Sequence, residues 1–153
     1  MKQLIIWILC TFSAAAYSQS YKEQFSALLE TSDTIAQQEL LQKWEKENSN
    51  DPELYTCYFN YHVNLSQKEV ISIEPEPNTE EYLEIKDSLG QTAGYITGRT
   101  IYTNDHVNKA LNYINKGISK HPSRLDMRFG KSYLLGEAGD FDSLTNEVVT
   151  TLG

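Results

Sequence analysis

Residues 107–152, VNKALNYINKGISKHPSRLDMRFGKSYLLGEAGDFDSLTNEVVTTL, decide the predicted fold class of this chain. Their apolar residues recur at three- and four-residue steps, which is the spacing of one face of an α-helix. Pro122 ends the first segment, because proline disfavours helical geometry in the residue before it. Gly139 suits a left-handed helix end, and Asp140 suits the cap of the next helix. The stretch therefore predicts three short amphipathic helices.

The apolar positions predict which side chains face the core. Asn104 and Asp105 are placed to cap the first of the three helices. A hairpin of short helices cannot bury both of its faces alone, so the pattern implies stacked neighbours. The stripes are Val107, Ala110, Leu111, Ile114 and Ile118 in the first helix, Leu125, Phe129, Tyr133 and Leu134 in the second, and Phe141, Leu144, Val148 and Leu152 in the third.

Three features resemble the tetratricopeptide repeat (TPR) family, whose unit is a helix-turn-helix of about 34 residues. Ala110 matches the small residue early in the second helix of the unit, and Pro122 matches its terminating proline. Residues 139–141, Gly-Asp-Phe, match the turn of the unit. The departures from the family pattern are Arg128, Lys131, Ser132, Leu144 and Thr151. The resemblance implies a curved stack of helix hairpins whose inner groove binds extended segments or helices.

The first residues predict an export signal. Lys2 precedes the apolar run 4–12, and small residues at 14–18 suit cleavage before Gln19. The run is too short for a membrane span. Two alternatives remain, a buried N-terminal helix and a lipoprotein anchored at Cys10. We expect residues 1–18 to be a signal peptide and residues 19–153 to be one exported domain, periplasmic or secreted.

Composition narrows the choice of partner. The chain has 153 residues and a net charge of -8. This charge argues against nucleic acid or an anionic membrane as partner, because both attract basic surfaces. After cleavage Cys57 is the single cysteine of the chain, so packing rather than an internal disulfide must hold the domain together.

The region before residue 67 predicts three further helices. The apolar positions of the first are Tyr21, Phe25, Leu28 and Leu29, and those of the second are Ile35, Leu40, Leu41 and Trp44. The third, at 53–65, is crowded with rings, which we interpret mainly as inter-helix core. The alternative is an aromatic groove for a peptide. The residues proposed for partner binding on that alternative are Tyr55, Tyr58, Tyr61, His62 and Arg128.

Residues 67–103 lose the helical period and predict a small β insertion. Residues 82–86 alternate apolar and polar side chains, as a half-buried strand does, and 93–96 are placed to return antiparallel. The competing interpretation makes 91–102 a helix. The insertion also concentrates acidic residues, which favours a solvated surface over a site for a basic partner or a weak Ca²⁺ site.

No residue pattern identifies a reaction. Residues 130–132, Gly-Lys-Ser, lack the upstream glycine of a phosphate loop and lie in a helical pattern. His62, His106 and His121 do not have the spacing of a zinc site. We therefore assign no catalytic, cofactor-binding or metal-ligating residue.

Together these patterns predict a mostly α fold, in which stacked antiparallel helix hairpins form a TPR-like α-solenoid fragment with a small β-hairpin insertion. The predicted function is an exported, non-catalytic interaction module that binds a protein or peptide. One alternative is an enzyme or small-ligand binder with a site between the insertion and the aromatic helix 53–65. Another is the N-terminal structural part of a larger repeat protein, in which a partner chain or further residues cover the apolar face of the last helix.

Overall fold

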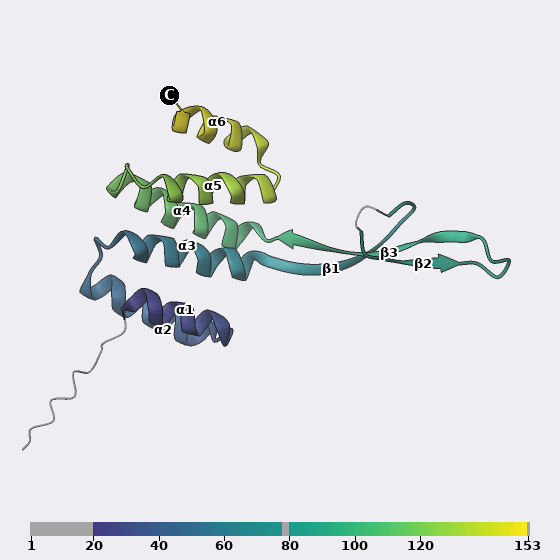
Figure 1. Ribbon diagram of the computed structural model, residues 1–153, viewed down its shortest axis with the longest axis horizontal. Coiled ribbons are helices and arrows are strands. Elements are labelled where there is room, and N and C mark those ends of the chain that lie inside the picture. The colour runs from purple at the N-terminus through teal and green to yellow at the C-terminus, as the bar shows by residue number, and fades with distance from the viewer. Residues whose placement is uncertain (1–19, 78–79, 153) are drawn as a thin grey trace, which may run out of the picture.

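The computed structural model describes residues 20–77 and 80–152, and the predicted export signal lies outside them. Within these residues the fold is mostly α with one small antiparallel sheet, as predicted (Figure 1). The helices are α1 (Tyr21–Glu30), α2 (Thr34–Glu47), α3 (Pro52–Ser66), α4 (Asn104–Lys120), α5 (Leu125–Glu137) and α6 (Phe141–Leu152). The strands are β1 (Gln67–Glu74), β2 (Tyr82–Lys86) and β3 (Thr92–Tyr102).

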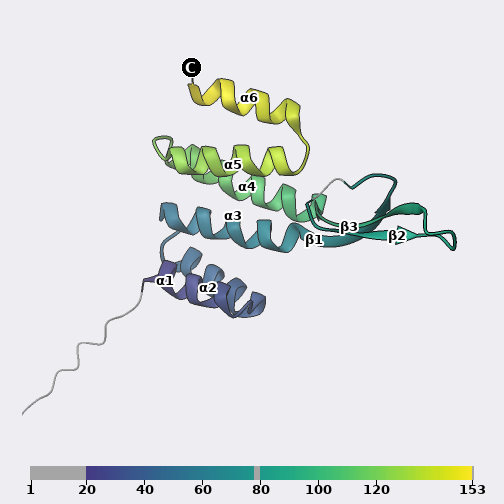
Figure 2. The same cartoon turned by 45° about the vertical axis from the view of Figure 1, so that its right-hand side comes forward.

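The helices form three successive hairpins, α1/α2, α3/α4 and α5/α6, stacked one on the next (Figures 1 and 2). Helix α3 packs against α1 and α2, and α5 packs against α4. One core cluster joins α1, α2 and α3 around Phe25, Leu41 and Trp44. The other joins α3, α4 and α5 around Phe59, Ile114 and other buried side chains. Helix α3 is therefore the element that the two clusters share.

Local sequence signals set most helix ends. Asp140 accepts a hydrogen bond from the Ser143 amide at 3.1 Å, and Gly139 has a φ of 75°. Both observations confirm the predicted α5–α6 turn. The predicted caps Asn104 and Asp105 are wrong, because Thr103 is the N-cap residue of α4. The Thr103 side chain does not cap the helix and donates instead to the Ser66 carbonyl oxygen at 3.2 Å.

The buried face of α5 differs from the prediction. Leu125, Phe129 and Tyr133 are exposed, and Phe129 has 62% of its surface accessible. Met127, Leu134 and Leu135 are buried instead, so only Leu134 was predicted correctly. The reason is steric. A Cβ atom added at Gly130 would lie 3.3 Å from the Phe59 ring, so Gly130 is the point of close approach between α5 and α3. Met127 and Leu134 lie on the same side of α5 as Gly130, so they face the core between α3 and α4.

The buried face of α6 also differs from the prediction, which placed Phe141, Val148 and Leu152 in the core. Its buried residue is Glu147, whereas Phe141, Val148 and Leu152 are exposed. Glu147 accepts hydrogen bonds from Arg128 Nη1 at 3.0 Å and from Lys131 Nζ at 2.6 Å, both on α5. A buried ion cluster therefore joins α6 to α5, and the apolar side of α6 faces away from it.

The sheet is a continuation of the α3/α4 hairpin. Strand β1 follows α3 directly, and β3 ends just before α4 begins. The strand order is β1-β3-β2, and both pairs are antiparallel. We call this sheet the ribbon, and Figures 1 and 2 show it projecting away from the stacked helices. The predicted β insertion is confirmed, and the competing helix at 91–102 is wrong.

Candidate functional site

One face of the ribbon is apolar and open. Antiparallel register places Ile71 opposite Gly98, Ile73 opposite Ile96, and Leu83 opposite Ile96 on its other side. Directly paired residues point to the same face of a sheet, so Ile71, Ile73, Leu83 and Ile96 share one face, which we call the ribbon face. Ile71 is 81% exposed and Leu83 is 68% exposed. Strand β2 was predicted to be half-buried and is instead largely exposed.

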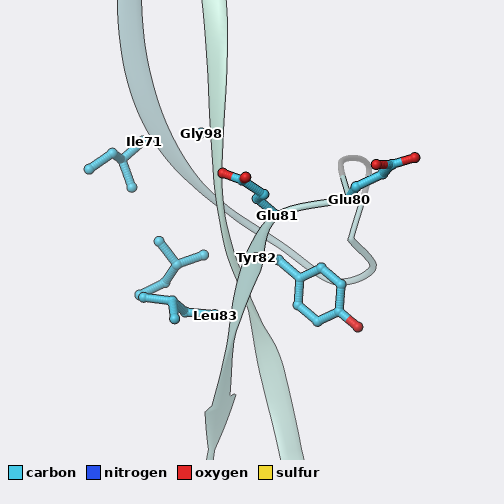
Figure 3. A pocket seen from close by; sticks show the side chains of 7 residues that line it. Ile71, Glu80, Glu81, Tyr82, Leu83 and Gly98 are labelled. Atoms are coloured by element: carbon cyan, nitrogen blue, oxygen red, sulfur yellow. The ribbon is translucent and has the colours of Figure 1, made fainter.

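A hollow of about 640 Å³ lies on this face. Figure 3 shows that Ile71 and Leu83 point to one side of the strands and Tyr82 to the other. Gly98 lies on the central strand β3 opposite Ile71, and a Cβ atom added there would meet no atom within 4 Å. The absence of a side chain at Gly98 therefore leaves the hollow open. Its lining residues are Ile71, Glu80, Glu81, Tyr82, Leu83, Ile96 and Gly98.

On the opposite face of the ribbon, side chains of neighbouring strands contact one another. Thr97 is buried there, and its hydroxyl lies 3.2 Å from that of Ser72 on the neighbouring strand. The Tyr82 and Tyr95 rings meet edge to face with centroids 5.2 Å apart. These cross-strand contacts support the strands from one side. The apolar face on the other side has no such cover among the described residues.

Two acidic residues, Glu80 and Glu81, line the hollow. Glu84 follows on β2, where it pairs with Tyr95 and points to the opposite face of the ribbon. The Thr92 hydroxyl donates to Glu84 at 2.5 Å, and together with Lys86 it lowers the pKa of that carboxyl. The lowered pKa keeps the Glu84 carboxyl ionised at neutral pH. The acidic residues of the described insertion are Glu69, Glu74, Glu76, Glu80, Glu81, Glu84 and Asp87, against Lys68, Lys86 and Arg99.

The ribbon also has two open edges. Because β3 is the central strand, β1 and β2 each pair on one side only in the described part of the chain. The outer backbone groups of an edge strand can pair with a strand from another protein. Ile71 and Ile73 lie on β1, so a strand added there would place its side chains beside the ribbon face.

The aromatic residues proposed for partner binding from the sequence lie in the core. Tyr55, Tyr58 and Tyr61 are all buried, which confirms the core interpretation for them. The Tyr55 hydroxyl donates to the Ser49 carbonyl oxygen at 2.6 Å, which joins α3 to the preceding turn. Arg128 is bound to Glu147 and is mostly buried. These four residues serve the packing of the helices rather than a surface groove.

His62 has a partner that sequence reasoning missed. Its Nδ1 atom lies 3.2 Å from Nδ1 of His106, so one ring must carry a proton between them. Burial, His106 and Lys109 lower the pKa of His62 to about 4, so its ring is neutral at pH 7. The two residues are 44 positions apart, and no local pattern signals their contact.

This histidine pair falls short of a metal centre. No group of three His, Cys, Asp or Glu side chains suited to holding a metal ion occurs among residues 20–77 and 80–152. A structural zinc site needs four ligands, and a catalytic one keeps three. Cys57 gives no nucleophile at neutral pH, because burial raises the pKa of its thiol to about 12.

The ribbon hollow takes no lining residue from α3, so it is not the small-ligand site expected between the insertion and the aromatic helix. None of the described helices has the length and apolar content needed to cross a membrane. No protein-family model matches the chain, and neither the curated proteins nor the solved structures gave a match. The ribbon and the helical stack are therefore the features that indicate a function.

Proposed function

We propose that this chain is an exported, non-catalytic interaction module with a TPR-like helical stack, and that its ribbon face binds an extended segment of another protein. The observation that carries the proposal is the apolar face on a projecting sheet. Ile71, Ile73 and Leu83 are large side chains exposed together, and such patches on soluble proteins typically mark interaction surfaces. Burying one such side chain contributes about 1.5–3 kcal/mol.

The surroundings of the face define the chemistry of the partner. An added strand beside β1 presents alternate side chains to Ile71 and Ile73, so apolar residues are favoured at every second position. Glu80 and Glu81 favour basic residues near the hollow. The partner segment is therefore extended, with apolar residues at every second position and basic residues near the hollow.

The TPR-like part of the proposal is supported by local geometry. Ala110 is fully buried, as the small residue at a close helix contact would be. Helix α4 ends at Lys120, two residues before Pro122, and Gly139 has the positive φ of a tight interhelical turn. Export is supported by the leader-like composition of the first residues.

The direct test uses a synthetic peptide of alternating lysine and valine, measured by fluorescence anisotropy. We expect the wild-type chain to bind it and the Ile71→Ser variant to lose about tenfold or more in affinity, because one large apolar contact on β1 is removed. Leu89→Ser is the matched control, since Leu89 is 81% exposed in the β2–β3 turn but does not line the hollow.

A peptide of alternating glutamate and valine tests the charge requirement. We expect weaker binding of this peptide, and we expect added salt to narrow the difference by screening the glutamates. Equal affinity of Ile71→Ser and Leu89→Ser would show that the ribbon face is not the binding surface. Equal affinity for the two peptides at low salt would refute the proposed role of the acidic surroundings.

The alternative of a structural part of a larger repeat protein is favoured by a different observation, the exposed apolar side chains of α5 and α6. That surface is separate from the ribbon.

A further inference from the structure

Helices α5 and α6 each expose a row of large apolar side chains. Leu125, Phe129 and Tyr133 follow one another at four-residue steps on α5, so they form one stripe along it. Phe141, Val148 and Leu152 form a corresponding stripe on α6, and Val149 lies at its margin. The exposed fractions of these seven residues range from 40% to 83%.

The stripe on α5 faces away from the rest of the stack. Helix α5 is seated by Met127 and Leu134, which are buried in the cluster shared with α3 and α4. At 3.6 residues per turn, Leu125 and Phe129 lie on the side of α5 opposite those two residues.

The stripe on α6 faces the same way. A hollow of about 400 Å³ marks the α4 side of the α5/α6 hairpin, and it is lined by Leu111 of α4, Lys131 of α5 and Thr150 of α6. Val148 and Leu152 lie on the side of α6 opposite Thr150 and its neighbour Asn146. The two stripes therefore form one surface on the side remote from α4. We call it the α5/α6 face, made of Leu125, Phe129, Tyr133, Phe141, Val148 and Leu152.

The same side of each earlier hairpin is covered. Helix α3 packs against both helices of the α1/α2 hairpin. Helix α5 is placed on the α3/α4 hairpin through Gly130 against Phe59 and through Met127 against Gly117. In the described part of the chain, nothing covers the equivalent side of the α5/α6 hairpin. In the two earlier hairpins, the side that corresponds to the α5/α6 face is therefore buried against a following helix.

We propose that a second copy of this chain covers the α5/α6 face, so that two α5/α6 hairpins pack face to face about a twofold axis. The distribution of charge favours a second copy as the occupant of this face. The side chains that make up the face, and Ser132 and Thr145 beside them, are all uncharged. A chain with a net charge of -8 repels its own copies over most of its surface, so an uncharged apolar patch is where two copies approach at least cost.

The exposed area of the face also favours a second copy. Large aromatic and aliphatic side chains exposed to the extent seen here present on the order of 700 Å² together. A stable interface of standard size buries roughly 800 Å² on each partner. The α5/α6 face is therefore about as large as a specific dimer requires. A single contact about a twofold axis would bury this face in both copies.

The dimer leaves the ribbons available. Figures 1 and 2 show the ribbon leaving the stack beside α3 and α4, whereas α6 lies at the far end of the stack. A twofold contact through α5 and α6 therefore presents two ribbon faces. A partner with two suitable segments would then bind with higher overall affinity, because binding of the first segment raises the effective concentration of the second at the other ribbon face.

The test is sedimentation equilibrium of the purified chain over a hundredfold range of concentration. We expect a reversible monomer–dimer equilibrium, with a thermal midpoint that rises with protein concentration. Phe129→Asp is expected to give a monomer at every concentration, with an unchanged far-ultraviolet circular dichroism spectrum because the side chain is exposed within one chain. Ile35→Asp is the matched control, since Ile35 is 72% exposed on α2, and it is expected to dimerise like the wild type.

Two outcomes would overturn the proposal. One is a wild-type chain that stays monomeric over the whole range. The other is a dimer that Phe129→Asp leaves intact, which would place the contact elsewhere. Neither outcome would contradict the proposed binding of an extended segment by the ribbon face, because that binding is tested on a separate surface and with separate variants.

Discussion

Replacing Glu147 by glutamine tests what holds α6 in place. The Glu147 residue is 6% exposed, and its two carboxylate oxygens accept from Arg128 and Lys131 on α5. The glutamine variant keeps the shape of the side chain and removes its charge. Two cations would then face a neutral amide in a mostly buried position.

The magnitude follows from burial. Removing one partner of a fully buried ion pair costs about 3–5 kcal/mol, chiefly because the remaining charge is left without compensation. The side chains of Arg128 and Lys131 keep 19% and 20% of their surface exposed, so water reaches them and reduces that cost. We expect Glu147→Gln to destabilise the docking of α6 by about 2–3 kcal/mol.

Native-state hydrogen exchange measures this effect helix by helix. Helix α6 buries little apolar surface, with Leu144 half-buried against Gly136 of α5. Its opening is therefore expected to be local, and amides of α6 should lose protection in Glu147→Gln while those of α3 keep it. Asp105→Asn is the matched control. Asp105 also binds a lysine at 2.7 Å, but at an exposed position, so little change is expected.

A compensating variant separates lost charge from lost contact. Converting Arg128 and Lys131 to methionine and Glu147 to leucine together removes all three charges, and such replacements are often neutral or stabilising. We expect this triple variant to recover most of the protection lost in Glu147→Gln. Unchanged α6 exchange in Glu147→Gln would refute the reasoning, because it would mean that the ion cluster does not hold the helix.

Three further predictions concern single positions. The lowered pKa of His62, about 4 against 6.5, means that the unfolded chain binds the proton more tightly, so stability is full above pH 6.5 and falls as the pH drops towards 4. Allowing for solvent around the half-buried ring, the loss is about 1–2 kcal/mol, and urea unfolding should show a flatter pH dependence in His62→Gln. Ile114→Ala is expected to cost about 2–5 kcal/mol in urea unfolding because Ile114 is fully buried, whereas Phe129→Ala is expected to leave a monomeric chain nearly unchanged; the reverse order would contradict the packing. Gly117→Ala is expected to cost about 1–3 kcal/mol because its Cβ would lie 2.7 Å from a buried tyrosine, whereas Gly98→Ala meets no atom, and equal thermal midpoints for the two variants would refute the close approach.

Local signals explain what the sequence predicted well. Pro122 and Gly139 mark helix ends by backbone geometry alone, and the helices of residues 107–152 lie where those signals place them. The insertion was predicted as strands because its β-branched residues and turns act over a few residues. These features need no knowledge of the neighbouring elements, so a single sequence contains them.

The orientation of α5 could not be predicted in the same way. Its sequence contains two apolar stripes, one through Phe129 and one through Met127 and Leu134, and both fit a helical period. Gly130 decides between them by allowing close contact with Phe59, which is 71 residues away in the chain. A choice that depends on a tertiary contact is invisible to a periodicity argument.

The same limit applies to the polar contacts between elements. The His62–His106 pair joins α3 to α4 across the whole insertion, so their spacing suggests no relation. Glu147 reads as a surface residue, because glutamate is rarely buried without a partner. Its partners Arg128 and Lys131 were assigned to other roles or to none, and only the antiparallel packing of α6 brings the three together.

Helix α6 buries a charged residue and exposes its apolar side chains. This arrangement supports the two-copy contact more strongly than the exposed area of the helix alone. A helix that used its apolar side chains to pack on α5 would gain stability without needing a buried charge. Here the apolar stripe of Phe141 and Leu152 faces outward, and the contact with α5 relies on an ion cluster that must offset its own desolvation. Within a single chain this arrangement has no advantage in stability. The arrangement becomes favourable once the second copy buries the outward stripe, because α6 then packs between α5 and that copy. The ion cluster determines which side of α6 faces α5 and which side faces the second copy.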